Sequence, residues 1–210
     1  MGRLNDLHAH GQAPWFDFVE RGFLKDGGLA KLVNEDGVTG VTSNPTIFEK
    51  AMGKGTAYDA SLAAFDKANP GAEPMARYEH LAIEDIRDAC DILRPVYDRL
   101  DAKDGYVSLE VSPYLALKGD ETAEEAVRLW AAVDRPNLMI KIPGTDAGVP
   151  AIRKTIAKGI NVNVTLLFSL EAYQAVALAY VEGLEDRVAA GEAVDGADDE
   201  AREMGEHVLA

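Results

Sequence analysis

The chain has 210 residues, 47% of them hydrophobic and 27% charged, a composition that excludes both an intrinsically disordered chain and a membrane protein. Lys and Arg total 21 against 36 Asp and Glu, and the resulting net charge of −15 at pH 7 opposes binding to nucleic acid. Cys90 is the single cysteine, so no internal disulfide can form, as is usual in a reducing compartment. Because neither a signal sequence nor a membrane-spanning run is found, we expect a soluble, cytoplasmic protein with no membrane partner.

Strand-like and helical segments alternate along the chain. Stretches rich in β-branched residues predict strands, at 38–44, 106–113, 138–142 and 160–167, with a weaker one at 14–19. Apolar residues at steps of two to four predict helices, at 73–100, 122–133, 149–158 and 169–185. An acidic segment from residue 191 predicts a flexible link, followed by a short helix at 200–208.

Several residues predict where these helices begin or end. Pro95 should end or kink its helix near Leu93, because proline lacks the N–H that a helix interior requires. Thr122 and Glu125 have the spacing of a capping box and predict a helix that starts at Thr122. Ser169 is expected to cap the last helix, whose predicted buried stripe consists of Ala175, Leu178, Ala179 and Leu184.

The order of strands and helices is typical of a parallel α/β sheet or barrel. Side chains alternate across each strand, with one aliphatic face and one polar face. A half-exposed antiparallel sheet would show the same alternation, but the intervening helices favour parallel strands covered by helices. In a closed (β/α)8 barrel the polar face reaches ligands at the C-terminal mouth, and the residues collected there are Thr42, Asn44, Glu110, Lys141, Asn163 and Thr165.

Lys141 is the most informative of these residues, because it lies inside a strand between two isoleucines. Burying an unpaired ammonium ion is costly, so this setting favours the neutral amine, the form that attacks a carbonyl group. The alternative is a lysine on the exposed edge of a sheet. A carboxylate and two amides on neighbouring strands favour the interpretation as a nucleophile.

Glu110 and Asp17 are candidates for moving protons. Glu110 lies on the polar face one strand before Lys141, and Asp17 stands among aromatic residues, where desolvation would make it a stronger base. Asp17 could instead cap the helix that follows it. Asn44, Asn163 and Thr165 suit a polyhydroxylated substrate, although each could simply be a satisfied buried group.

Other features indicate no metal or cofactor. His8 and His10 resemble a metal-binding pair, but no third ligand lies near them in the sequence. The Gly-Lys-Gly segment at 53–55 lacks the spacing of a phosphate-binding loop. Cys90 is expected to be a small core residue in a helix.

Four motifs together resemble the transaldolase family. They are Gly-Val-Thr-Ser-Asn-Pro-Thr-Ile-Phe at 40–48, Val-Ser-Leu-Glu-Val-Ser-Pro at 107–113, Leu-Met-Ile-Lys-Ile-Pro-Gly-Thr at 138–145 and Ile-Asn-Val-Asn-Val-Thr-Leu-Leu-Phe-Ser at 160–169. They occur in the order and at the intervals of the longer bacterial type, which has a helical insertion between its second and third strands. The resemblance covers roughly residues 10–190.

The resemblance implies dihydroxyacetone transfer from sedoheptulose 7-phosphate or fructose 6-phosphate to an aldose phosphate, in the pentose phosphate pathway. It implies that Lys141 forms a Schiff base, without a metal or cofactor, and that Asp17 takes the proton from the C4 hydroxyl. Glu110 would act through a water that Thr165 helps to hold. Asn44 and Asn163 would bind the dihydroxyacetone hydroxyls, and Thr42 is grouped with them as a substrate-binding residue.

The chain departs from the family after residue 190. Family barrels have eight strands, and only about five are predicted here; the sixth, with a serine and an arginine that bind phosphate, should begin near residue 195. We therefore expect an incomplete (β/α)8 barrel at 1–190 and an acidic linker with a short helix at 191–210. The alternatives are another class I sugar-phosphate aldolase and an inactive barrel fragment that associates with itself, as a homo-oligomer, or with a partner.

Overall fold

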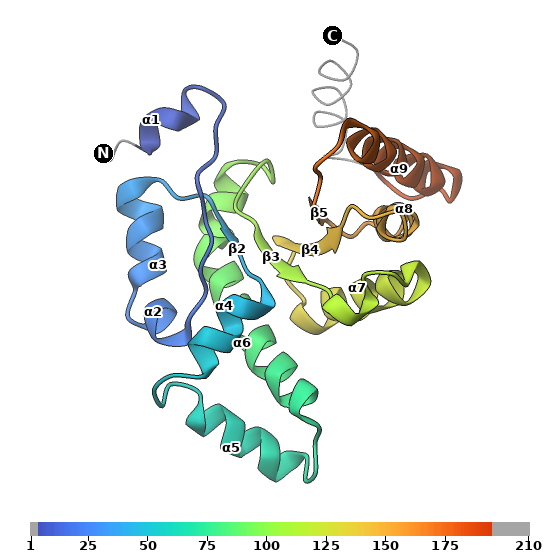
Figure 1. Cartoon of the computed structure of the whole chain (residues 1–210). Coiled ribbons are helices and arrows are strands. Elements are labelled where there is room, and N and C mark those ends of the chain that lie inside the picture. Colours follow the sequence, from blue (N-terminus) through green and yellow to red (C-terminus); the bar gives the residue numbers. More distant parts are fainter. Residues whose placement is uncertain (1–3, 195–210) are drawn as a thin grey trace. The chain divides into compact units, whose positions relative to one another are not determined.

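The computed structural model describes residues 4–194 (Figure 1). The helix expected at 200–208 and most of the expected linker therefore lie outside the described residues. The chain divides into two compact units. Unit 1 consists of Met1–Leu109 and Ala132–Leu138, and unit 2 consists of Glu110–Ala131 and Met139–Ala210.

All five predicted strands are confirmed among the described residues, and most are shorter than predicted. They are β1 (Trp15–Phe16), β2 (Gly40–Thr42), β3 (Val107–Glu110), β4 (Leu138–Pro143) and β5 (Val162–Thr165). Their order in the sheet follows the chain, and every strand pairing that follows is parallel. The fold is that of an incomplete (β/α)8 barrel, as the sequence predicts.

Hydrogen bonds and register define the strand pairing inside each unit. In unit 1, Phe16 is opposite Val41 and Thr42 is opposite Ser108. In unit 2, Lys141 is opposite Asn163 and Pro143 is opposite Thr165. The Val111 N–H also donates to the Lys141 carbonyl at 3.1 Å, so the end of β3 runs alongside β4.

The aliphatic strand faces form the core, as predicted. Val41 and Val107 are fully buried in unit 1, and Ile140 and Ile142 are fully buried in unit 2. The prediction fails towards the end of the last strand, where Leu166 is 56% exposed. Aliphatic packing is thus strongest on the inner strands of each unit.

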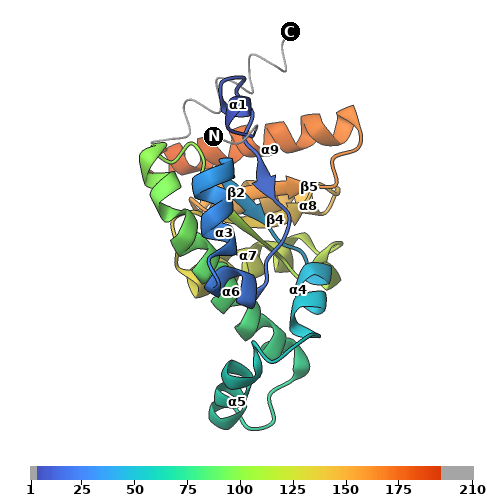
Figure 2. The same ribbon diagram turned by 90° about the vertical axis from the view of Figure 1, so that its left-hand side faces the viewer.

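One short helix precedes β1, and helices follow each strand. In unit 1 they are α1 (Asn5–His8), α2 (Arg21–Lys25), α3 (Gly28–Lys31), a π-helical turn (Leu32–Asp36), α4 (Pro45–Met52), α5 (Asp59–Ala68) and α6 (Pro74–Arg99). Between β2 and β3, α4 and α5 precede the long α6 (Figure 2), which agrees with the expected helical insertion. A 3-10 turn (Pro113–Leu115), α8 (Gly148–Ala157) and α9 (Leu170–Ala189) belong to unit 2, and α7 (Gly119–Val133) lies mostly in it.

The long helix does not end near Leu93, and the next helix does not start at Thr122. Helix α6 continues through Pro95 to Arg99, because Pro95 and Asp91 lie on the exposed side, where water can hydrogen-bond the carbonyl that Pro95 leaves without a donor. Helix α7 begins at Gly119 rather than Thr122. Thr122 lies inside the helix, and its hydroxyl donates to the Leu115 carbonyl at 2.9 Å.

The last helix is capped as predicted, and its predicted buried stripe is confirmed only in part. The Ser169 side chain accepts a hydrogen bond from the Ala172 N–H, a cap that typically contributes about 1 kcal/mol. Ala179 is buried as predicted, whereas Leu178 is 62% exposed, and α9 also buries Val176 and Gly183. A Cβ at Gly183 would lie 2.8 Å from the Ile156 Cβ, so the close packing of α8 and α9 requires a glycine there.

Candidate active site

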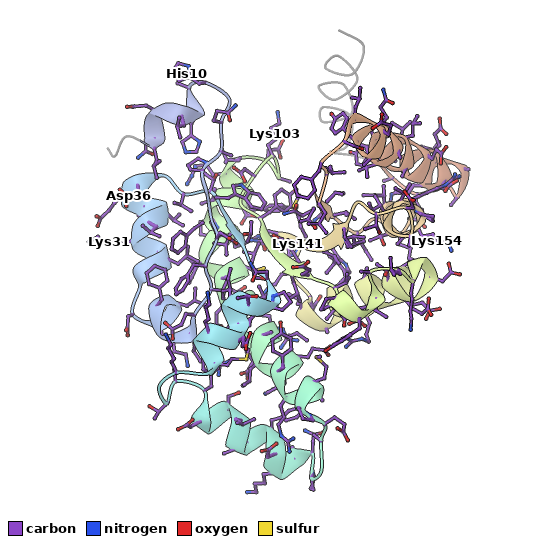
Figure 3. All side chains as sticks on the ribbon, in the orientation of Figure 1. His10, Lys31, Asp36, Lys103, Lys141 and Lys154 are labelled. Atoms are coloured by element: carbon purple, nitrogen blue, oxygen red, sulfur yellow. The ribbon has the colours of Figure 1, made fainter. Side chains whose placement is uncertain are left out.

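Lys141 lies on β4 between the two fully buried isoleucines and is only 8% exposed. Figure 3 shows it on the strand, whereas Lys154 lies on the helix that follows. The alternative of an edge-strand lysine is wrong, because β4 pairs with β5 on one side and accepts the Val111 hydrogen bond on the other. An interior strand therefore presents an amine in a largely dehydrated setting.

Glu110 is the carboxylate that faces this amine. Lys141 Nζ and Glu110 Oε2 are 3.7 Å apart, which is longer than the roughly 2.7–2.9 Å of a charge-assisted hydrogen bond. The Glu110 side chain is 26% exposed, so water reaches it more easily than it reaches the lysine. This geometry suits a proton carrier beside a nucleophile, since the two groups interact without being locked together.

β5 places two further predicted residues beside Lys141. Asn163 is directly opposite Lys141 in the register, and Thr165 lies two residues farther along on the same face. Thr165 Oγ1 is buried and has no hydrogen-bond partner, a condition that typically costs about 1–3 kcal/mol. The alternative of a satisfied hydroxyl is therefore wrong for Thr165.

Backbone strain occurs at the same end of β5. Leu166 has φ of +62°, a left-handed conformation that costs a non-glycine residue about 1–2 kcal/mol. Gly144 follows β4, its N–H donates to the Thr165 carbonyl at 2.7 Å, and a Cβ there would lie 2.6 Å from Leu167 Cδ2. Strain and an unsatisfied hydroxyl in one place are typical of functional sites.

The other three predicted residues belong to unit 1, and two of them are in contact. The Thr42 hydroxyl donates a hydrogen bond to Asp17 Oδ1. Trp15 packs directly over Gly40, since a Cβ at Gly40 would lie 2.2 Å from the indole ring. This packing fixes β1 against β2 and brings the Asp17 carboxylate to Thr42.

The predicted environment of Asp17 needs correction. Asp17 is exposed, so the desolvation expected from its aromatic neighbours is absent. It does not cap α2 either, because Glu20 does so by accepting hydrogen bonds from the Gly22 and Phe23 N–H groups at 2.8 Å. The aromatic residues Phe16 and Phe18 instead pack with Phe23 and so restrain the backbone on either side of Asp17.

Asn44 combines a structural and a candidate binding role. Its Oδ1 accepts a hydrogen bond from the Ile47 N–H at 3.0 Å and so caps α4, with Pro45 in the favoured first helical position. The cap uses the amide oxygen and leaves Nδ2 to donate to another acceptor. The alternative, that the amide is already hydrogen-bonded within the protein, therefore holds for Oδ1.

A buried charge network in unit 1 was missed by the sequence analysis. Arg21 Nε donates to Asp85 Oδ1 at 2.7 Å, and the Tyr58 hydroxyl donates to Asp85 Oδ2 at 2.7 Å. Burial raises the pKa of Asp85, while the hydrogen bonds from Tyr58 and Arg21 oppose that rise. The paired residues are 64 positions apart in the sequence, and no local pattern connects them.

His8 and the Cys90 thiol each have a structural setting in unit 1. His8 Nε2 is hydrogen-bonded to the Gly37 carbonyl at 2.8 Å, and Cys90 is fully buried in α6 as predicted. In the part of the chain that the structure describes, no three His, Cys, Asp or Glu side chains are grouped so that they could hold a metal ion. Within residues 4–194, no helix is long and apolar enough to cross a membrane.

Comparison with known proteins gives consistent results. The family model for transaldolase/fructose-6-phosphate aldolase matches residues 14–197. A transaldolase from Trichodesmium erythraeum is 49% identical over 192 residues, which are 91% of this chain and 50% of the relative. A transaldolase from Thiobacillus denitrificans is 51% identical over 191 residues, which are 91% of this chain and 53% of the relative. The chain thus spans about half the length of these curated relatives.

Proposed function

Because the chain belongs to the transaldolase/fructose-6-phosphate aldolase family, we propose that it serves transaldolase chemistry, with Lys141 as the Schiff-base residue. The donor would be sedoheptulose 7-phosphate or fructose 6-phosphate, and the acceptor an aldose phosphate. The observation that carries the proposal is the largely buried Lys141 amine, 3.7 Å from Glu110 and opposite Asn163.

Imine formation is the first step. The neutral Lys141 amine attacks the C2 carbonyl of the donor, forming a C–N bond and a carbinolamine, and the carbinolamine loses its oxygen as water. Glu110 transfers the protons for this dehydration, through a water molecule held by the unsatisfied Thr165 hydroxyl. The side chain of Asn163, opposite the lysine, would hold a hydroxyl of the bound ketose.

Carbon–carbon cleavage follows once the imine is protonated. Asp17 removes the proton from the C4 hydroxyl, the C3–C4 bond breaks, and its electron pair moves into the imine, which becomes an enamine. An aldose phosphate leaves, and dihydroxyacetone stays bound to Lys141. Asn44, through its Nδ2, is the other residue assigned to the hydroxyl groups of the bound fragment.

Transfer reverses these steps with a second aldose phosphate. The enamine carbon attacks the aldehyde of the acceptor, Asp17 returns a proton to the new alkoxide, and hydrolysis of the imine releases the new ketose phosphate. This reaction belongs to the non-oxidative pentose phosphate pathway, which places the protein in the cytoplasm. We assign the barrel to residues 1–190, and self-association into a homo-oligomer remains part of the proposal.

Borohydride trapping on the 210-residue chain tests the proposal. The chain is incubated with fructose 6-phosphate and sodium borohydride, digested, and mapped by mass spectrometry. We expect a reduced adduct on the peptide that contains Lys141. A Lys141→Met variant should give no adduct, and a Lys154→Met variant, which removes an exposed helix lysine, should react like the original chain.

The outcomes separate the alternatives. An adduct on another lysine, or none at all, overturns the proposed function for this chain. An adduct at Lys141 with release of free dihydroxyacetone, but no transfer to an added aldose phosphate, indicates simple aldol cleavage. Formation of a new ketose phosphate supports transaldolase activity.

A further inference from the structure

The Thr42 hydroxyl is already engaged in unit 1. A hydroxyl carries a single proton, and that of Thr42 is donated to Asp17 Oδ1. The strand register explains the contact, because Phe16 is opposite Val41 and the next residue on each strand is Asp17 and Thr42. The hydroxyl therefore has no second proton with which to bind a substrate oxygen.

The backbone around Asp17 is held from its other side. Phe16, Phe18 and Phe23 form a cluster in which each pair of ring centroids is 5.7 Å apart. The flanking phenylalanines project away from the Asp17 side chain, because residues alternate across an extended segment. With the backbone fixed, the remaining freedom of the carboxylate lies in its own side-chain torsions, and the hydrogen bond from Thr42 restricts these.

We propose that Thr42 is a positioning residue for Asp17: it holds Oδ1 so that Oδ2 is the oxygen that exchanges a proton with the substrate. This inference rests on the proposed function and assigns Thr42 to orientation rather than to substrate contact. Threonine suits the task because its β-branched side chain has few χ1 rotamers on a strand. The restricted rotamer of Thr42 therefore fixes the direction in which its hydroxyl points.

The Thr42→Val substitution tests the inference. It keeps the β-branched shape and removes the hydroxyl, and the exposed Asp17 carboxylate can take water in its place. We expect the midpoint of chemical denaturation to stay where it is in the original chain. Thr39→Val is the matched control, since Thr39 lies in the same segment and its buried hydroxyl has no hydrogen-bond partner.

The first measurement needs no activity. Three-bond couplings to the Asp17 carboxyl carbon report its χ1 rotamer populations by NMR, with the signal assigned by comparison with Asp17→Asn. We expect one dominant rotamer in the original chain and in Thr39→Val, mixed rotamers in Thr42→Val, and a restored rotamer in Thr42→Ser. An unchanged rotamer in Thr42→Val overturns the inference.

The second measurement is kinetic. Thr42→Val should lower the rate of carbon–carbon cleavage by about 10- to 100-fold, with little change in KM or in the rate of imine trapping at Lys141, and Thr42→Ser should recover most of the loss. In an Asp17→Asn background the same substitution should have no further effect, because the residue then has no carboxylate to orient. Equal losses in both backgrounds, or a change in KM alone, contradict a positioning role.

The two measurements distinguish two kinds of failure. If the chain gives no adduct at Lys141, the proposed function fails, and the rotamer measurement still decides whether Thr42 orients Asp17. If the adduct forms but Thr42→Val leaves both the rotamer and the cleavage rate unchanged, only the inference about Thr42 fails.

Discussion

The Arg21–Asp85 pair in unit 1 and the Lys141–Glu110 pair in unit 2 both join a largely buried cation to a carboxylate, but they are built in opposite ways. Arg21 and Asp85 are joined by a 2.7 Å hydrogen bond, and both side chains are almost fully buried. Both oxygens of Asp85 are used, and Arg21 also donates to the Leu81 carbonyl and to Glu84. Such a network stabilises one arrangement of the helices that carry it.

The pair in unit 2 is more widely spaced and lies closer to water. Lys141 and Glu110 are separated by 3.7 Å, and Glu110 is partly exposed to water. On the neighbouring strand, Thr165 has an unsatisfied hydroxyl and Leu166 a strained backbone. The comparison teaches that close, saturated hydrogen bonding marks a structural charge pair, whereas a loose pair with unsatisfied neighbours marks a site for chemistry.

The same substitution at the two cations gives the largest expected contrast. Arg21→Met leaves Asp85 buried and without its cation, which should lower the free energy of unfolding by about 3–5 kcal/mol. Lys141→Met should leave this free energy unchanged or raise it, because Glu110 can be hydrated and a buried amine is removed. Chemical denaturation measures both, and a large destabilisation by Lys141→Met would contradict the distinction between the pairs.

A second prediction concerns the carboxylate of the loose pair. Glu110→Gln keeps the shape but removes the proton carrier, and general acid–base groups contribute about 10²- to 10⁴-fold to a rate. We expect a loss of that order in borohydride trapping at Lys141, with the fold intact. Glu124→Gln on the exposed side of α7 is the control and should react at the original rate; equal rates in the two variants would exclude Glu110 from imine formation.

The face of a strand on which each side chain lies was predictable from the sequence. Contacts between segments that are distant in the sequence were not. The alternation around Lys141 and Asn163 assigns each to the polar face, and the structure puts them opposite each other. The Arg21–Asp85 contact depends on how α2 meets α6, which no local spacing records. The short helices α2 and α3 were missed for a related reason, since helices of four or five residues carry little periodic signal.

The predicted desolvation of Asp17 shows a second limit. Aromatic neighbours in the sequence indicated burial, yet an extended segment sends adjacent side chains to opposite sides. Phe16 and Phe18 therefore pack with Phe23, and Asp17 remains exposed. Sequence proximity to apolar residues predicts burial only when the period of the element puts them on the same face.

Cys90 in unit 1 offers a third prediction, as an inert counterpart to the Lys141 nucleophile. Burial raises the pKa of the Cys90 thiol from 9.0 to about 12, so the folded state keeps the proton that the unfolded state loses. The protonated thiol therefore makes its full contribution to the free energy of unfolding below pH 9, and this contribution is lost as the pH rises towards 12. We expect the free energy of unfolding to fall by up to about 1.4 kcal/mol per pH unit in this range.

The measurement compares denaturation at several pH values for the original chain and for Cys90→Ala. The difference between the two should grow with pH in the stated direction, since the variant lacks the titrating thiol. Alkylation at pH 8 provides an independent check, because a protonated and buried thiol should react only after unfolding. Rapid alkylation of the folded chain would contradict the structural assignment of Cys90.

The smallest expected effect is at Leu166, where unit 2 stores strain. Leu166→Gly removes the penalty of φ +62° and loses little apolar burial, because the side chain is mostly exposed, so we expect stabilisation of up to about 1 kcal/mol. Ala102 in unit 1 has φ of +63° and no predicted site residue beside it, which makes Ala102→Gly the matched control. Both variants should gain stability, but only Leu166→Gly should slow imine trapping, since it loosens the backbone that holds Thr165. Equal trapping rates would show that the strain at the end of β5 serves the fold and not the reaction.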